Sequence, residues 1–303
     1  MSVKGFFRVL RVYSLLFVLS IIWGLAFVAI KYLEPFLTPV NLTLLRWFIA
    51  SAALIILIPF LGKPAKKFEK IDLPRFLLVA FANVVSYHLT LNYSERSIST
   101  GLAVLLTALG PVFILVLSWL YLGERHGKKV LAAISLAFSG SAVLASGSLL
   151  TNGSYTLPGI LEAVGTAASY SVFAVFSKPL VTKYGARPLA IWAGLAGTAM
   201  LLPLLSGSFF TQISALPVEG WLAMLYLSIL STVAGYMLFY TLINRGAVSR
   251  LSIQLYLIPV VGVAGGVLIL SESITVFTVA GGALMLLAVA VSTSKLGEKL
   301  ESR

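Results

Sequence analysis

The chain has 303 residues, of which 59% are hydrophobic and only 11% carry a charge, and its net charge is +12. Soluble chains carry about 25% charged residues, whereas here apolar runs of roughly 20 residues, long enough to cross a bilayer, alternate with short charged clusters. This composition excludes a large soluble domain, attributes the basic charge to cytoplasmic loops rather than to nucleic-acid binding, and, without cysteine, excludes disulfides and cysteine nucleophiles.

Hydropathy divides the chain into ten predicted membrane spans. The first run follows Lys4, Arg8 and Arg11, and it is too long for the core of a signal peptide, so we expect it to remain as the first span. Apolar residues fill each run without the alternation of barrel strands, which favours helices. The predicted spans are 12–33, 40–61, 73–93, 99–122, 128–147, 158–178, 188–206, 218–241, 248–270 and 274–294.

The basic residues predict an orientation. If the N-terminus lies in the cytoplasm, all but three of the 22 basic residues fall on the cytoplasmic side. The exceptions, Lys31, Arg46 and Arg96, are expected at the opposite face. Because Lys and Arg collect in cytoplasmic loops, we expect a multi-pass protein of the cytoplasmic membrane with both termini in the cytoplasm.

One pattern occurs twice along the chain. The apolar run 101–124 contains Pro111 and ends at Glu124, and the run 251–272 contains Pro259 and ends at Glu272. Both the prolines and the glutamates are separated by 148 residues. A proline and a glutamate at one common offset indicate a single structural unit used twice.

Other segments extend this repeat. The segment 23–31 aligns with 170–178, and 87–93 resembles 236–242. Each half holds five predicted spans, an odd number, so the second half must enter the membrane from the opposite side. The sequence therefore predicts an all-α integral membrane protein of ten transmembrane helices in two inverted five-helix repeats, residues 1–150 and 151–303.

Three segments carry a resemblance to a known family. They are Trp23-Gly-Leu-Ala-Phe-Val-Ala-Ile-Lys31, the stretch 102–124 with its Leu-Gly-Glu-Arg ending, and the second copy at 249–272. In their order and spacing they resemble the EamA family of the drug/metabolite transporter superfamily over nearly the whole chain. The resemblance implies ten helices that move small metabolites, often amino acids, through a central cavity. The second copy departs from the pattern, with Ser271-Glu272-Ser273 where the first has Gly123-Glu124-Arg125.

The repeated prolines and glutamates have structural and functional interpretations. Pro111 and Pro259 each remove a backbone hydrogen bond near mid-membrane, which suits a pair of bending gate helices, although proline is also common in transmembrane helices. Glu124 and Glu272 are each expected to cap the helix that follows them. Contact with substrate is the alternative for both glutamates.

Polar and aromatic side chains inside spans are the candidates for substrate binding, because an unpaired polar group is costly in hydrocarbon. Asn83 and Tyr87 are four residues apart and are expected to share a helix face. His88 could exchange a proton during transport or could simply pack, and Glu162 could bind substrate or extend to the interface. The predicted substrate-binding residues are Trp23, Asn83, Tyr87, His88, Thr107, Glu162, Tyr170, Gln254 and Tyr256.

These features favour a secondary transporter that exports small polar or amphipathic metabolites, such as amino acids, by alternating access. Few charges lie inside the spans, which disfavours phosphate-bearing substrates. No enzyme motif, Walker A sequence or metal-ligand cluster is found, so we expect no catalysis and no cofactor. A passive facilitator or channel and a proton-coupled uptake carrier remain alternatives. The expected partners are the substrate, the lipid bilayer and, for the coupled alternative, protons. We expect no nucleic-acid partner, and an oligomer is not required.

Overall fold

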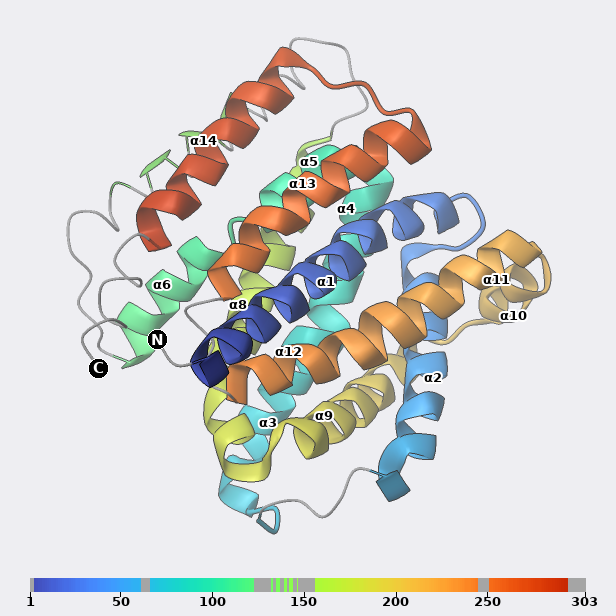
Figure 1. Ribbon diagram of the computed structural model, residues 1–303. Coiled ribbons are helices and arrows are strands. Elements are labelled where there is room, and N and C mark those ends of the chain that lie inside the picture. Colours follow the sequence, from blue (N-terminus) through green and yellow to red (C-terminus); the bar gives the residue numbers. More distant parts are fainter. Residues whose placement is uncertain are drawn as a thin grey trace.

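The computed structural model describes residues 3–60, 66–122, 156–244 and 251–293, together with scattered positions between 132 and 146. The regular elements in this part of the chain are helices packed side by side in a bundle (Figure 1). Six helical stretches are long and apolar enough to cross a membrane, and three shorter apolar helices accompany them. Together they coincide with nine of the ten predicted spans. The fifth, 128–147, lies largely outside the described residues.

Among the described residues, the first half contains a helix of 31 residues, α1, and a span interrupted by a π-helix. The third predicted span is built from three consecutive helical pieces, of which the π-helix η3 lies in the middle. The elements are α1 (Val3–Leu33), α2 (Pro39–Leu57), η1 (Ile58–Phe60), η2 (Lys70–Asp72), α3 (Leu73–Ala80), η3 (Phe81–Ser86), α4 (Tyr87–Ser97), α5 (Thr100–Thr107) and α6 (Gly110–Leu122).

The second half repeats this plan and adds a short helix that the sequence did not predict. A second π-helix, η5, interrupts the eighth span much as η3 interrupts the third. The elements are α8 (Leu157–Tyr184), α9 (Ala186–Leu201), η4 (Leu202–Leu204), α10 (Gly207–Ser214), α11 (Val218–Leu225), η5 (Tyr226–Ala234), α12 (Gly235–Asn244), α13 (Leu251–Leu270) and α14 (Val276–Thr293).

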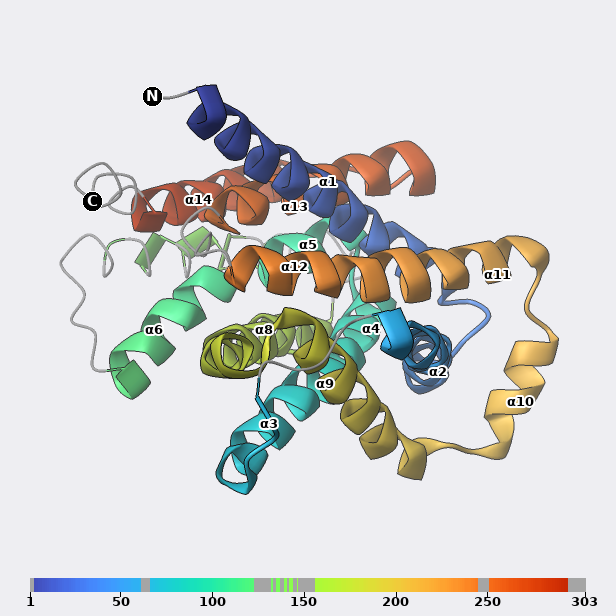
Figure 2. The ribbon, with the colours of Figure 1, turned by 60° about the horizontal axis from the view of Figure 1, so that its bottom comes forward.

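The extra helix α10 ties the second half to the start of α2. The Gln212 side-chain oxygen accepts hydrogen bonds from the Thr38 amide at 2.9 Å and from the Asn41 side chain at 2.8 Å. Phe209 packs edge-on against Phe48, with 5.5 Å between ring centroids. These contacts explain why α10 lies against α2 at the edge of the bundle (Figure 2).

The packing of the helices follows the sequence repeat. α1 lies along α13, and α8 lies along α5 and α6, so span one meets span nine as span six meets span four (Figures 1 and 2). Similarly α2 packs on η5, and α9 packs on η3. Among the described residues, these two contacts between the halves therefore each have a counterpart when the halves exchange roles.

Glycines permit the close approach of α1 and α13. A Cβ atom added at Gly24 would lie 2.6 Å from the Cβ of Val261, and one added at Gly265 would lie 2.6 Å from Val28 Cγ2. Both distances are shorter than Cβ atoms tolerate, so a side chain at either glycine would force its neighbour to move, and the glycines allow the close spacing of the pair. Small residues have this role in many membrane bundles, where they let helix backbones approach closely.

The two repeated prolines lie in different backbone settings. α5 ends at Thr107 and α6 begins at Gly110, so the chain breaks where Pro111 predicts a bend, and Pro111 falls in the first turn of α6. A proline there removes no helical hydrogen bond. Pro259, in contrast, lies inside α13, which continues through it.

Candidate functional site

Four aromatic residues meet at the centre of the bundle, where the two halves face each other. Trp23 of α1 lies beside Tyr236 of α12, with 5.7 Å between ring centroids. Tyr87 of α4 lies 6.4 Å from Tyr170 of α8. Since the repeat aligns Trp23 with Tyr170 and Tyr87 with Tyr236, the two aromatic pairs occupy equivalent positions in the two halves.

Two small cavities share these aromatic walls. One has a volume of about 40 Å³, and the other has a volume of about 20 Å³. A single water molecule needs about 10–15 Å³ of such space, so neither cavity has room for a metabolite in the observed arrangement. Both cavities are lined by Trp23, Phe27, Tyr87 and Tyr170; the larger adds Val104, Thr107, Ala108, Ile258 and Pro259, and the smaller adds Ala26, Arg46, Leu91, Ser231 and Tyr236.

Several predicted site residues line these two cavities, and others do not. Trp23, Tyr87, Thr107 and Tyr170 do so, as does the predicted gating residue Pro259. Asn83 instead lines a third cavity of about 10 Å³, and neither His88 nor Glu162 lines any of the three. The side chains of Pro111, Gln254 and Tyr256, and the whole of Glu124, lie outside the described residues.

The π-helix η3 changes which residues of the third span share a face. We expected Asn83 and Tyr87 on one face from α-helical spacing, yet they line different cavities. A π-helix closes its backbone hydrogen bonds five residues apart, and this shifts the positions of the side chains that follow relative to an α-helix. In addition, the ring nitrogen Nδ1 of His88 lies 2.9 Å from the Asn83 carbonyl oxygen. The ring of His88 is fully buried against Trp47, and its Nε2 has no hydrogen-bond partner among the described residues.

Glu162 lies near the start of α8 and away from the central aromatic residues. Its side chain is half-buried, and its Oε2 atom has no hydrogen-bond partner among the described residues. Its backbone carbonyl accepts a hydrogen bond from Thr166 Oγ1 at 2.9 Å. The described structure thus gives Glu162 a place in the α8 wall of the bundle but no contact with the central cavities.

Arg46 corrects one expectation from the sequence. We expected it at the outer membrane face, but only 4% of it is exposed and it lines the smaller central cavity. Its Nε donates to Thr232 Oγ1 at 2.8 Å, and its Nη2 donates to Ser231 Oγ at 3.1 Å. Its place near the start of α2 suggested the interface. One feature of the sequence could have predicted its burial: Ser231 and Thr232 place two adjacent hydroxyl groups inside an apolar span, where they need a hydrogen-bond partner.

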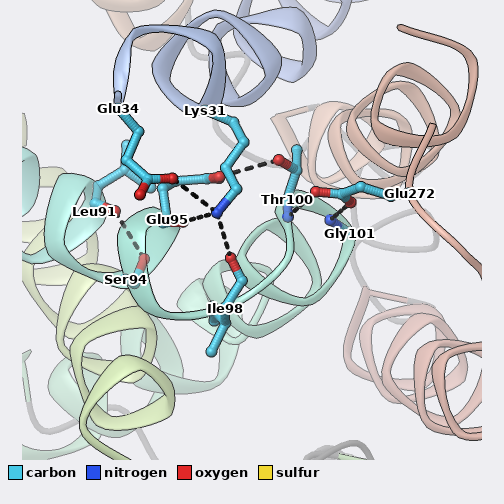
Figure 3. Close-up of polar contacts among 9 residues, drawn as sticks. All are labelled: Lys31, Glu34, Leu91, Ser94, Glu95, Ile98, Thr100, Gly101 and Glu272. Carbon is cyan, nitrogen blue, oxygen red and sulfur yellow. Dashed lines mark hydrogen bonds and ion pairs between the residues drawn. The ribbon is translucent and has the colours of Figure 1, made fainter. Parts of the chain in front are cut away.

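Lys31 binds groups of the protein at the end of its helix. Its ammonium group donates to the backbone carbonyls of Glu95 and Ile98 and pairs with Glu34 at 3.0 Å (Figure 3). Glu95 and Ile98 mark the C-terminal end of α4. A cation there satisfies carbonyls that the helix leaves without internal partners.

The end of α13 meets the start of α5 through Glu272. Its carboxylate accepts hydrogen bonds from the backbone amides of Thr100 at 2.8 Å and Gly101 at 3.1 Å (Figure 3). Glu272 therefore caps a helix, as predicted, but that helix is α5 of the other half and not the following helix α14. The carboxylate binds the free amides and the positive end of α5.

A second carboxylate, that of Glu95, also contacts Thr100. Glu95 is fully buried, and its Oε2 accepts a hydrogen bond from Thr100 Oγ1 at 3.1 Å, whereas its Oε1 has no hydrogen-bond partner among the described residues. The sequence prediction missed this acid because it ended the third span at residue 93. We call the group formed by Lys31, Glu95, Thr100 and Glu272 the polar seam (Figure 3).

Comparison with known proteins places this architecture in a family. The model of the EamA-like transporter family matches residues 10–146 and again residues 157–294. The chain belongs to the EamA-like transporter family. An uncharacterized transporter from Archaeoglobus fulgidus is 33% identical over 90% of this chain and 95% of its own length.

Two further relatives of this EamA protein have names that mention amino acids. A probable terminal-alkyne amino-acid exporter from Streptantibioticus cattleyicolor is 30% identical over 92% of this chain and 93% of its own. A probable amino-acid metabolite efflux pump from Escherichia coli is 29% identical over 88% and 89%. A crystal structure with 20% identity has the same fold, with a TM-score of 0.60 over 96% of this chain and 99% of that one. The EamA chain is thus a multi-pass membrane transporter of small molecules, in a family of transporters rather than enzymes.

Proposed function

We propose that this EamA protein is a ten-helix secondary transporter that exports small amphipathic metabolites, amino acids among them, across the cytoplasmic membrane by alternating access. The observation that carries the proposal is the central aromatic group, in which Trp23 and Tyr236 of one pair are equivalent to Tyr170 and Tyr87 of the other. Transporters made of inverted repeats hold substrate near mid-membrane, between the repeats. Residues 1–150 and 151–303 are the two halves in this proposal.

Alternating access is supported by the size of the central cavities. Spaces of about 40 and 20 Å³ require the aromatic walls to separate before a metabolite can enter. The break between α5 and α6 and the proline inside α13 give two places where the walls can bend. In the proposed orientation, with both termini in the cytoplasm, the polar seam closes the outer end.

Counterflow in proteoliposomes tests the carrier mechanism. Liposomes that contain the purified protein and unlabelled amino acids should accumulate labelled amino acid, saturably and transiently. Tyr170→Ala removes a cavity wall and should abolish the exchange. Leu161→Ala, on the same helix but 61% exposed, is the matched control and should exchange normally. Linear flux without saturation would identify a channel or facilitator instead.

Orientation-sorted vesicles test the direction of transport. Right-side-out vesicles that contain the protein should lose preloaded substrate faster than inside-out vesicles. The export direction is taken from the relatives named as an exporter and as an efflux pump. Faster accumulation in right-side-out vesicles, driven by an inward proton gradient, would support the proton-coupled uptake alternative.

A further inference from the structure

We propose that Arg46 binds the carboxylate of the transported substrate, and that the substrate is a small monocarboxylate with an apolar side group, such as a neutral amino acid. This inference rests on the proposed function and adds a substrate class to it. Its basis is a buried cation on a cavity wall, near aromatic side chains from both halves of the protein.

The charge of Arg46 has no counter-ion among the described residues. The ion pairs of that part of the chain are formed by Lys31 and Lys183, and the partners of Arg46 are the neutral hydroxyls of Ser231 and Thr232. A guanidinium group retains its charge when it is buried, so burial without an anion is strongly unfavourable. Charged groups at membrane depth are therefore candidate ligand sites by default.

The geometry leaves one side of the guanidinium group available. Nε and Nη2 are held by the two consecutive hydroxyls of η5, whereas Nη1 has no hydrogen-bond partner in the described part of the chain. Both hydroxyls lie in a π-helical segment, a distortion that is frequent at functional sites. Arg46 thus lines the cavity and keeps one donor without a partner among the described residues, and a carboxylate is the anion that arginine binds with good geometry.

The neighbouring cavity determines what accompanies the carboxylate. The larger cavity shares Trp23, Tyr87 and Tyr170 with the Arg46 cavity, and its remaining walls are mainly aliphatic, including Val104 and Ile258. An anionic group at Arg46 therefore places the rest of a small molecule among apolar side chains. One cation matches one negative charge, which favours a monocarboxylate over a phosphate ester.

An amino group is optional in this arrangement. Among the described residues that line the three cavities there is neither Asp nor Glu. An ammonium group would rest on aromatic faces, where attraction is weaker than in an ion pair. In addition, the residue equivalent to Arg46 in the second half falls near Ala193 and Gly194, so the chain has one such cation and not a symmetric pair.

Four matched compounds test the proposal on the purified wild-type protein. Phenylalanine and 3-phenylpropionate keep the carboxylate, whereas phenylalanine amide and phenethylamine lack it. A ligand that binds the folded state raises its apparent melting temperature. We expect both acids to stabilise the protein and the amide and amine to bind at least about tenfold more weakly. Equal binding of the amide, or stabilisation by neither acid, would overturn the proposal.

Variants of Arg46 provide an independent readout. Arg46→Gln should weaken 3-phenylpropionate binding by about tenfold or more, and Arg46→Lys should retain part of it. Arg96→Gln, at an exposed position, is the control and should bind as wild type does. If Arg46→Gln fails to fold, the comparison of acid and amide binding to the wild-type protein still tests whether the site binds a carboxylate.

Counterflow separates this inference from the transporter function. Exchange of phenethylamine or phenylalanine amide without exchange of either acid would leave the carrier intact and remove the carboxylate assignment. Failure of all four compounds to exchange, together with failure of a panel of sugars, nucleosides and other amino acids, would remove the proposed function itself.

Discussion

Two polar residues inside spans, the buried His88 and the half-buried Glu162, have roles that transport assays can test. Neither lines a central cavity. We therefore expect His88→Gln and Glu162→Gln to leave the response of counterflow to a pH gradient unchanged. The measurement is exchange in proteoliposomes with and without an imposed gradient. Loss of the response in either variant would assign proton coupling to that residue.

The buried carboxyl group of Glu95 makes a prediction about stability. Glu95→Gln retains an oxygen that can accept the Thr100 hydroxyl, so its stability should stay close to that of wild type. Glu95→Ala leaves that hydroxyl without its acceptor and opens a cavity, which should cost about 1–3 kcal/mol of unfolding free energy. Thermal unfolding in detergent compares the two. An alanine variant as stable as the glutamine variant would show that the contact contributes nothing.

At the scale of elements, the two prolines are predicted to contribute unequally to turnover. Pro259 lies inside α13 and lines the larger cavity, so Pro259→Ala restores a helical hydrogen bond and should slow turnover while binding changes little. Pro111 lies in the first turn of α6, where alanine restores none, so Pro111→Ala should have a smaller effect. Turnover is measured as the rate of counterflow, and substrate binding is measured as the shift in melting temperature. Equal rates for both variants and wild type would reject a role for these prolines in gating.

The Glu272 cap of α5 is predicted to hold one end of the bundle closed. Glu272→Ala removes the acceptor of two backbone amides, so α5 and α13 should separate more often and open a path to the cavity. The chain has no cysteine, so Thr107→Cys gives a clean reporter on the cavity wall. Its labelling by an impermeant maleimide from outside should rise several-fold in the Glu272→Ala background.

An exposed reporter controls for general effects on labelling. Arg96→Cys, at an exposed position, should react at the same rate with or without Glu272→Ala. A rise at both reporters would mean that the substitution loosens the whole protein. No rise at Thr107→Cys would show that the cap does not close the path to the cavity.

The sequence predicted the helical spans better than the contacts between them. Uninterrupted apolar runs identify spans without reference to neighbours, which is why nine of them coincide with helices in the described residues. The π-helices could not be predicted, because their extra residue per turn depends on packing such as that of η3 on α9. The cap from Glu272 to α5 joins residues 171 and 172 apart in sequence, beyond the reach of any local pattern.

The candidate site was predicted only where the repeat or residue type carried the signal. Trp23 and Tyr170 were proposed for the cavity wall and lie there, and the repeat aligns them with each other. Arg46 was missed because it has no counterpart in the second half and because its partners are two neutral hydroxyls on a distant segment. Hydropathy alone assigns such a residue to the interface.

At the scale of the whole molecule, the repeat predicts a second seam at the other end of the bundle. Glu272 binds the start of α5, in the fourth span. The residue equivalent to Glu272 is Glu124, which lies outside the described residues, and the equivalent of the fourth span is the ninth. By this symmetry Glu124 should cap the start of the ninth span at the cytoplasmic end.

If alanine at the two glutamates opens the central cavity to reagents from opposite sides of the membrane, the protein has two opposed gates. Glu124→Ala should raise labelling of Thr107→Cys from the cytoplasmic side in inside-out vesicles, and Glu272→Ala should raise it from the outer side. Each variant should leave labelling from the other side no higher than in wild type, because alternating access keeps one end closed while the other opens. If Glu124→Ala raised labelling from the outside, the inverted relation between the two halves would be wrong.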